Sequence, residues 1–162
     1  MNKICLCLAL AVLAACGGPS KKVMHSLNVQ KNAGKATYAH LFYNGYHPLL
    51  DEVTFKLDST SVDDSYGYTQ ANPVMVSGAT ESGAYNQRRF LNALLGPAGE
   101  TVTYTRRGSC CPFNSPNGFM NGGLLDLYEV TIAGQSKPVV LYLNLYDKGI
   151  LRAPKGFTFK NK

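Results

Sequence analysis

Apolar side chains recur at helical spacing in one part of the chain, and this pattern predicts a single helix over residues 84–95. Ser82 precedes the pattern and is a suitable N-cap, because its hydroxyl can accept a hydrogen bond from the first turn. Gly96 and Pro97 follow the last apolar residue. Since glycine favours a left-handed cap and proline blocks continuation, the helix is expected to end before them.

Alternation with a period of two predicts strands on both sides of the helix. In residues 52–57 it places Val53, Phe55 and Leu57 on one face, as in a half-buried strand. The same pattern predicts strands over 74–76, 100–107, 124–132, 139–146 and 157–159. A glycine-containing loop, 133–138, would join the strands 124–132 and 139–146 as a hairpin, whereas 108–123 is expected to be a loop. The pattern therefore predicts a single compact α+β domain over residues 51–162, with mostly antiparallel strands and one helix.

The N-terminus has the pattern of a secretory signal. One lysine precedes an apolar run, 4–15, that is shorter than the roughly 20 residues of a membrane-spanning helix. The run ends in Leu13-Ala14-Ala15-Cys16, which resembles the lipobox of bacterial lipoproteins, where the cysteine is acylated and the chain is cut just before it. We therefore expect residues 1–15 to be a lipoprotein signal peptide and Cys16 to carry a lipid. An ordinary signal peptide without a lipid is the alternative.

Two segments would separate the lipid from the domain. Residues 16–37 begin with Cys16 and are rich in glycine, serine, lysine and asparagine, so we expect a flexible tether. Residues 38–50 carry aromatic side chains around Asn44-Gly45 and are interpreted as an aromatic linker or hairpin. His40 and His47 flank this turn and are expected to be core or aromatic-belt histidines. Because no further ligands occur at suitable spacing, neither a metal site nor a cofactor is predicted.

The net charge of +6 narrows the choice of partners. Basic residues near a membrane attract acidic headgroups, but the chain has no clustered basic motif of a nucleic-acid module. We expect the membrane to be a partner through the N-terminal lipid, an envelope protein or a glycan to be a further partner, and nucleic acid to be none. Gly17, rather than aspartate, after Cys16 favours the outer membrane, facing the periplasm, by resemblance to lipoprotein sorting.

Two cysteines remain for chemistry in the exported domain. The cysteines before residue 16 would leave with the signal peptide and Cys16 would be acylated, which leaves Cys110 and Cys111. Exported proteins sit in an oxidising compartment. A disulfide between neighbours is strained, however, because their Cα atoms lie about 3.8 Å apart and disulfides usually span roughly 4.4–6.8 Å. Three interpretations stay open: buried thiols, a labile vicinal disulfide, or a reactive thiol whose pKa Arg106 and Arg107 would lower.

Arginines supply the other candidate chemistry. Arg88 and Arg89 lie in the predicted helix, and with Arg106 and Arg107 they would form a fork that binds an anion. A solvated basic face is the simpler interpretation. The chain has no nucleophile elbow, zinc-protease, phosphate-loop or dinucleotide motif, so no catalytic residue is assigned.

Several segments after residue 86 resemble a known family. They are NQRRFLNALLGP (86–97), RGSCCPF (107–113), GLLD (123–126) and LYLN (141–144), and the resemblance covers most of residues 64–159. By these segments the chain is similar to a family of small bacterial lipoproteins, whose members often carry the name 2-dehydro-3-deoxyphosphooctonate aldolase. The aldolase itself is a cytoplasmic (β/α)8 barrel. Such barrels take about 250 residues, and this chain has 162, so the resemblance implies a lipoprotein and no aldolase residue is carried over.

The sequence therefore predicts a lipid-anchored protein of the cell envelope whose domain is a binding or interaction module. Binding is favoured because the anchor, the tether and an aromatic strand face are present, while catalytic motifs are absent. The alternative is a small thiol-active, redox or anion-binding enzyme that uses Cys110 and Cys111 with Arg106 and Arg107.

Overall fold

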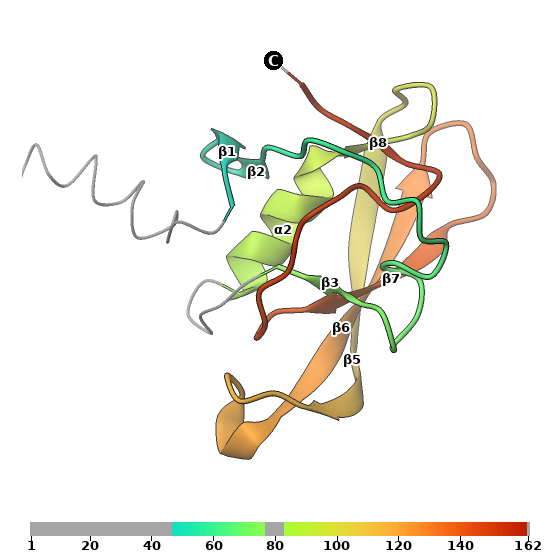
Figure 1. Cartoon of the computed structure of the whole chain (residues 1–162). Coiled ribbons are helices and arrows are strands. Elements are labelled where there is room, and N and C mark those ends of the chain that lie inside the picture. The colour runs from blue at the N-terminus through green and yellow to red at the C-terminus, as the bar shows by residue number, and fades with distance from the viewer. Residues whose placement is uncertain (1–46, 77–82, 162) are drawn as a thin grey trace, which may run out of the picture. The chain divides into compact units, whose positions relative to one another are not determined.

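A four-stranded sheet runs through the domain and carries the candidate site (Figure 1). The structure, a computed structural model, describes residues 47–76 and 83–161. The strands of this sheet lie in the order β3-β7-β6-β5. Their bounds are β3 (Val74–Met75), β5 (Val102–Asn114), β6 (Gly122–Ile132) and β7 (Val139–Asn144). Both β5 and β7 pair antiparallel with β6, and β3 is parallel to β7.

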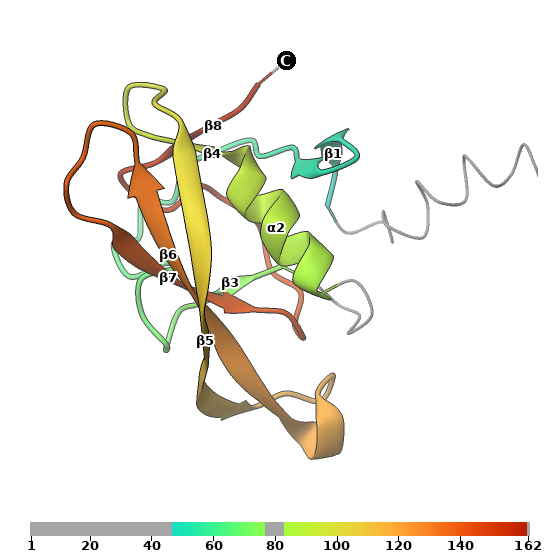
Figure 2. The same cartoon turned by 180° about the vertical axis from the view of Figure 1, so that it is seen from behind.

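The helix α2 (Gly83–Ala93) packs beside this sheet (Figure 2). Its apolar stripe lies in the core, where Phe90 and Leu91 are fully buried together with Val130 and Leu143 of the sheet. Burying side chains of this size contributes about 1.5–3 kcal/mol each. The main core therefore lies between the helix and one face of the sheet.

Two short antiparallel sheets flank the core. β1 (Leu49–Asp51) pairs with β2 (Thr54–Phe55), and β4 (Leu94–Leu95) pairs with β8 (Thr158–Phe159). A 3-10 turn, η2 (Phe119–Asn121), connects β5 to β6. Ala153, near the end of the chain, is buried in the same core as Phe55. Segments far apart in sequence are thus needed to complete the core.

The predicted α+β class, with one helix and mostly antiparallel strands, is confirmed for the described residues. The helix ends at Ala93, earlier than predicted, because the next two residues form β4 and pair with β8. The predicted left-handed cap at Gly96 is wrong, since its φ is not positive. Glycine is needed there for space, because a Cβ would collide with the side chains of Glu100 and Ile132.

Two strand predictions are corrected. The strand predicted over 52–57 is reduced to β2, and Val53, predicted to lie on the buried face, is 61% exposed, while Thr54 is buried. A tight β1–β2 turn, in which Asp51 accepts a hydrogen bond from the Val53 amide, breaks the alternation. The loop predicted over 108–123 is also wrong for most of its length. β5 continues through the first half of this stretch, and β6 begins before it ends.

Several predictions fall outside the described residues. These are the signal peptide over 1–15, the acylation of Cys16, the tether over 16–37, the Asn44-Gly45 turn and the Ser82 cap. In the ranges that the structure does describe, no helix is long and apolar enough to span a membrane.

Candidate functional site

A bulge in β5 decides which side chains meet on the hairpin. In a regular strand Arg106 and Ser109 would point to opposite faces, because they are three residues apart. The register shifts between Arg106 and Gly108, so that Arg106 pairs with Tyr128 and Ser109 pairs with Asp126. Gly108 has a φ of 138°, a conformation that favours glycine. The bulge therefore brings both side chains to the face of the sheet that α2 covers.

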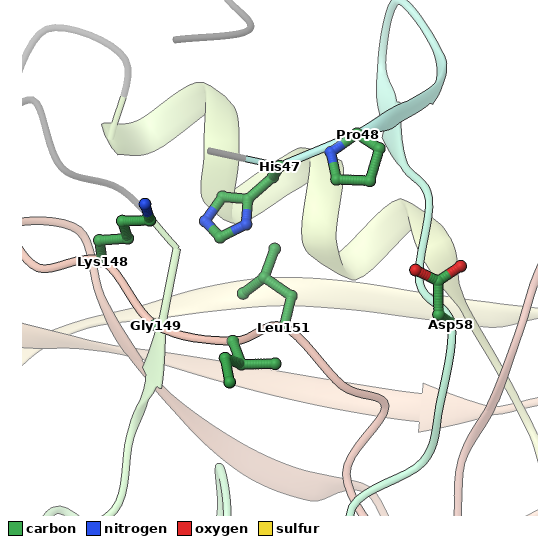
Figure 3. Close-up of a pocket in the computed structure, with 7 residues that line it drawn as sticks. His47, Pro48, Asp58, Lys148, Gly149 and Leu151 are labelled. Carbon is green, nitrogen blue, oxygen red and sulfur yellow. The ribbon is translucent and has the colours of Figure 1, made fainter. Parts of the chain in front are cut away.

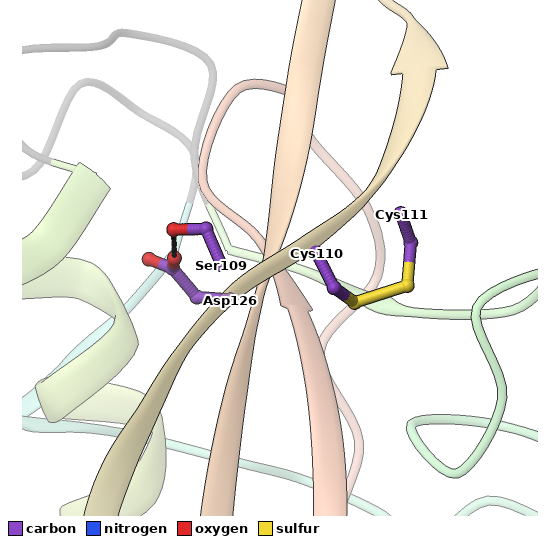
Figure 4. The surroundings of a disulfide bond; sticks show 4 residues. All are labelled: Ser109, Cys110, Cys111 and Asp126. Carbon is purple, nitrogen blue, oxygen red and sulfur yellow. Dashed lines mark hydrogen bonds between the residues drawn. A yellow bond between two sulfur atoms is a disulfide. The ribbon is translucent and has the colours of Figure 1, made fainter.

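Asp126, which is itself buried, is the centre of a polar cluster on this face (Figure 4), and the cluster reaches solvent through Arg106 and Ser109. Its Oδ1 accepts hydrogen bonds from Arg106 Nη2 at 2.6 Å and from Ser109 Oγ at 2.7 Å. Its Oδ2 accepts a hydrogen bond from Gln87 Nε2, on α2, at 2.9 Å. Gln87 Oε1 in turn accepts a hydrogen bond from the Tyr128 hydroxyl at 3.0 Å. We name these five residues the Asp126 cluster.

Hydrogen bonds keep the Asp126 carboxyl ionised. Burial raises the pKa of Asp126, but the hydrogen bonds to the carboxylate, led by that from Arg106, outweigh this effect and lower the pKa below its ordinary value. An ionised acceptor suits charge-assisted hydrogen bonds, which are the stronger kind. The cluster therefore fastens the bulged hairpin to the helix.

This arrangement is better suited to structure than to catalysis. Ser109 donates its proton directly to a carboxylate of lowered pKa, which is a weak base. Arg106 also donates to the Ser109 oxygen at 2.6 Å. Within the described residues, no histidine joins the cluster to activate the serine, and no group of three or more His, Cys, Asp or Glu side chains could hold a metal ion.

Cys110 and Cys111 form a disulfide on the opposite side of the hairpin from Ser109 and Asp126 (Figure 4). A second register shift, between Cys110 and Pro112, leaves Cys111 as the extra residue of a bulge, with a φ of 58°. A left-handed backbone is uncommon for a residue with a side chain. Of the three interpretations left open by the sequence, the structure has the vicinal disulfide, and both cysteines are partly exposed.

The helix arginines have partners of their own. Arg88 lies over the ring of Tyr85, with 4.7 Å between its guanidinium carbon and the ring centroid. Arg89 is buried and donates from Nε to the carbonyl oxygen of Glu52 at 3.0 Å. Arg88 is exposed whereas Arg89 is buried, so the two guanidinium groups do not present one anion-binding surface.

The strand arginines are also paired, and they differ in the face they occupy. Arg106 belongs to the Asp126 cluster, across the sheet from the disulfide. Arg107 forms an exposed ion pair with Glu129 at 3.1 Å, which places a negative charge beside it. The environment that was expected to lower a thiol pKa at Cys110 is therefore less positive than the sequence indicated.

The connection between β5 and β6 presents apolar side chains to solvent. Phe119 is 86% exposed and Met120 is 85% exposed, at an end of the hairpin that extends past the other strands (Figures 1 and 2). No charged residue occurs between Arg107 and Asp126. We name residues 115–121 the apical turn. Sequence reasoning missed this feature because it treated the stretch as a plain loop, although the adjacent Phe and Met in a long uncharged run were a signal.

Hydrogen bonds hold the apical turn against the end of β7. Asp147 Oδ1 accepts from Ser115 Oγ at 2.7 Å and from Asn117 Nδ2 at 2.9 Å, and Asn144 Nδ2 donates to Oδ2 at 2.9 Å. Burial raises the pKa of Asp147, but these hydrogen bonds outweigh it and lower the pKa. Ser115 is completely buried. The exposed side chains are therefore displayed by a braced turn.

A separate cavity of about 350 Å³ lies beside His47 (Figure 3). Its lining includes Asp58 and Lys148. His47 is buried, as a core histidine is, its ring meets Phe55 edge-on at 5.2 Å, and its Nε2 has no hydrogen-bond partner among the described residues. Burial and the nearby charge of Lys148 lower the pKa of His47 to about 4, so the imidazole is neutral at pH 7.

Comparison with known proteins finds no matching family model, no similar curated protein and no similar solved structure. The resemblance to a family of small bacterial lipoproteins stays a prediction.

Proposed function

We propose that this protein is a lipid-anchored protein of the bacterial cell envelope, attached to the outer membrane through Cys16 and facing the periplasm. The short apolar leader and the lipobox ending at Cys16 support the anchor. The folded domain is a non-catalytic binding module. The observation that carries this second part is the apical turn, where Phe119 and Met120 are held in place yet exposed.

Exposure of this kind has no benefit for folding stability. A solvated Phe or Met contributes no buried area to the core, and adjacent exposed apolar side chains commonly mark a contact surface. The brace on Asp147 limits the conformations of the turn before any partner arrives, which reduces the entropy lost on binding. A rigid apolar display therefore favours recognition as the role of the hairpin.

The anchor is tested by labelling cells with palmitate, with and without globomycin, and by mass spectrometry of the mature protein. We expect a diacylglyceryl-modified Cys16 at the mature N-terminus, precursor accumulation under globomycin, and no label in a Cys16→Ser variant. An unmodified thiol at position 16, or an uncut leader, would contradict the anchor.

The binding module is tested by placing a photo-crosslinking amino acid at position 119 in cells. The control carries the same group at Val62, which is 95% exposed and lies outside the apical turn. We expect cross-linked products at position 119 well above those at position 62. Equal yields at both positions would show that the turn contacts its surroundings no more than any other exposed site.

The disulfide favours a second candidate, a thiol or redox module that uses Cys110 and Cys111. Both cysteines are partly exposed and therefore accessible to a reductant or a partner thiol. Thiol counting before and after mild reduction, together with a Cys110→Ser, Cys111→Ser variant, separates the candidates. If the domain is a binding module, this variant keeps the cross-links at position 119. If it is a redox module, the parent protein releases two thiols on mild reduction and exchanges them with a partner thiol, and the variant does neither.

A further inference from the structure

We propose that the partner of the apical turn is the lipid bilayer, and that Phe119 and Met120 enter the interfacial layer of the membrane next to the anchor. The proposal rests on the lipid anchor of the proposed function and names the partner of the binding module. It makes the domain a protein with two membrane contacts, one covalent through Cys16 and one through the folded hairpin.

The charge and shape of the hairpin end suit a lipid layer. From Gly108 to Leu125 every residue is uncharged, so the hairpin itself carries no charged side chain into the layer. The charged group in contact with the turn, Asp147, is hydrogen-bonded to Ser115, Asn117 and Asn144. Leu124, 45% exposed, adds apolar surface on the adjoining strand. The apex is an end of a hairpin, and the cavity beside His47 is lined by residues outside it. A lipid layer accepts such an apolar protrusion without a complementary pocket.

The backbone of the turn already satisfies several of its own polar groups. The Ser115 amide donates to the Asn121 carbonyl at 3.0 Å, and the Asn121 amide donates to the Gly118 carbonyl at 3.3 Å. The Gly118 amide donates to the Ser115 carbonyl at 3.1 Å, and the Gly122 amide donates to Phe119. Unpaired amides are costly in an apolar medium, so internal pairing lowers the cost of entry.

The turn's conformation aims the two apolar side chains outward. Met120 and Asn121 have φ values of 52° and 59°, which are uncommon for residues with side chains. Gly118 allows this tight path, because a Cβ there would collide with the Gly122 carbonyl. Such strained positions concentrate where a conformation serves a contact.

The anchor keeps the domain within reach of the bilayer. The segment 17–46 joins Cys16 to the described domain. Even fully extended, 30 residues span only about 100 Å. Tethering raises the local concentration of the turn at the surface, so two apolar side chains suffice for a contact that would be weak in a free protein.

Tryptophan fluorescence gives a direct test, because the chain contains no tryptophan. The acylated Phe119→Trp protein is reconstituted on vesicles of phosphatidylethanolamine and phosphatidylglycerol, with an acylated Val62→Trp protein as the matched control. We expect the emission of Trp at position 119 to shift to shorter wavelength and to be quenched by brominated lipids. Trp at position 62 should show neither effect. If Phe119→Trp does not fold, as judged by thermal unfolding, Met120→Trp replaces it.

The outcomes separate this inference from the proposed function. Solvent-like, unquenched emission at position 119 in a protein shown by mass spectrometry to be acylated overturns the membrane contact and leaves the anchor intact. Solvent-like emission on pure vesicles, but shielding in native envelope membranes, also overturns it, in favour of a protein partner. An unmodified Cys16 refutes the anchor. In that case quenching of the unacylated protein by concentrated vesicles supports the contact, and its absence overturns it.

Discussion

Gln87 on α2 and Asp126 on β6 are joined by a buried hydrogen bond of 2.9 Å across 39 positions of sequence. The same amide accepts a hydrogen bond from Tyr128 at 3.0 Å. One side chain therefore orients two groups of the sheet and sets the position of the helix over the bulged hairpin. This relationship underlies the first two predictions.

Replacing Gln87 with leucine should destabilise the domain by about 1–3 kcal/mol, the usual cost of leaving buried polar groups without partners. The Tyr128 hydroxyl and one Asp126 oxygen would both lose a hydrogen bond. Urea unfolding at pH 7 measures the change in free energy. Gln70→Leu, at an exposed position, is the matched control and should change stability little. Equal effects of the two substitutions on the free energy of unfolding would contradict a structural role for the cluster.

Asp126 should contribute to acid sensitivity. Its pKa is lowered in the folded state, so the unfolded chain binds more protons at low pH. This stability is present above the unfolded pKa of about 3.9 and is lost as pH falls through the lower folded pKa. Asp126→Asn should be less stable at pH 7 and show a flatter decline between pH 5 and pH 2 in urea titrations. Asp58→Asn, an exposed control, should decline as the parent does. Parallel curves for Asp126→Asn and the parent would contradict the assignment.

His47 should make the domain less stable in mild acid. Its folded pKa of about 4 lies below the unfolded value of about 6.5, so the unfolded chain takes up the proton first. The contribution is complete above pH 6.5 and is lost as pH falls toward 4. His47→Phe, which keeps an aromatic ring beside Phe55, should unfold with a shallower pH dependence across this window. The check is thermal unfolding of both proteins at several pH values, and an unchanged slope would refute the shift.

The left-handed backbone at Cys111 predicts a difference between two substitutions. In a Cys110→Ser background, Cys111→Gly should be more stable than Cys111→Val by about 1–2 kcal/mol, because only glycine adopts positive φ without steric cost. Both variants lack the disulfide, so the comparison isolates the backbone. Chemical unfolding measures it, and equal stability would mean that the bulge relaxes once the disulfide is gone.

Two glycines, Gly118 in the apical turn and Gly122 directly after it, should not be equivalent. Gly118→Ala should disrupt the turn, since its Cβ would meet the Gly122 carbonyl. Gly122→Ala should be tolerated, because the nearest atom to its Cβ is 3.6 Å away and its φ is an ordinary −124°. Amide hydrogen exchange in residues 115–121 reports the difference. Faster exchange in both variants, or in neither, would contradict the predicted contrast.

The local part of the fold followed from the sequence. Helical periodicity located α2, and alternation located β6, β7 and the start of β5. What alternation could not show is a bulge, because one extra residue reverses the face of everything after it. The stretch after Arg107 contains Gly, Ser, Pro and Asn, which have low strand propensity, and tertiary pairing with β6 overrides that propensity.

The candidate site was predictable only in part. Cys110 and Cys111 stood out because they are the two cysteines of the sequence that follow Cys16. The Asp126 cluster did not, since the hydrogen bonds that Asp126 and Gln87 make within it span 17 to 41 positions and form only after the bulge and the helix packing are fixed. The sequence suggested one anion-binding fork of four arginines because all four carry the same charge. In the structure each arginine contacts a different residue, because the four side chains point from different faces of their helix and strand.

The late contribution of the chain to the core has a consequence for biogenesis. Ala153 exchanges backbone hydrogen bonds with Ser59 and Ser61, and the Lys160 amide donates to the carbonyl of Ala93. A chain emerging from its N-terminus therefore cannot enclose its interior until almost all of it has been released. A chain that stopped short of Ala153 would lack these hydrogen bonds and would leave the core around Phe55 incomplete.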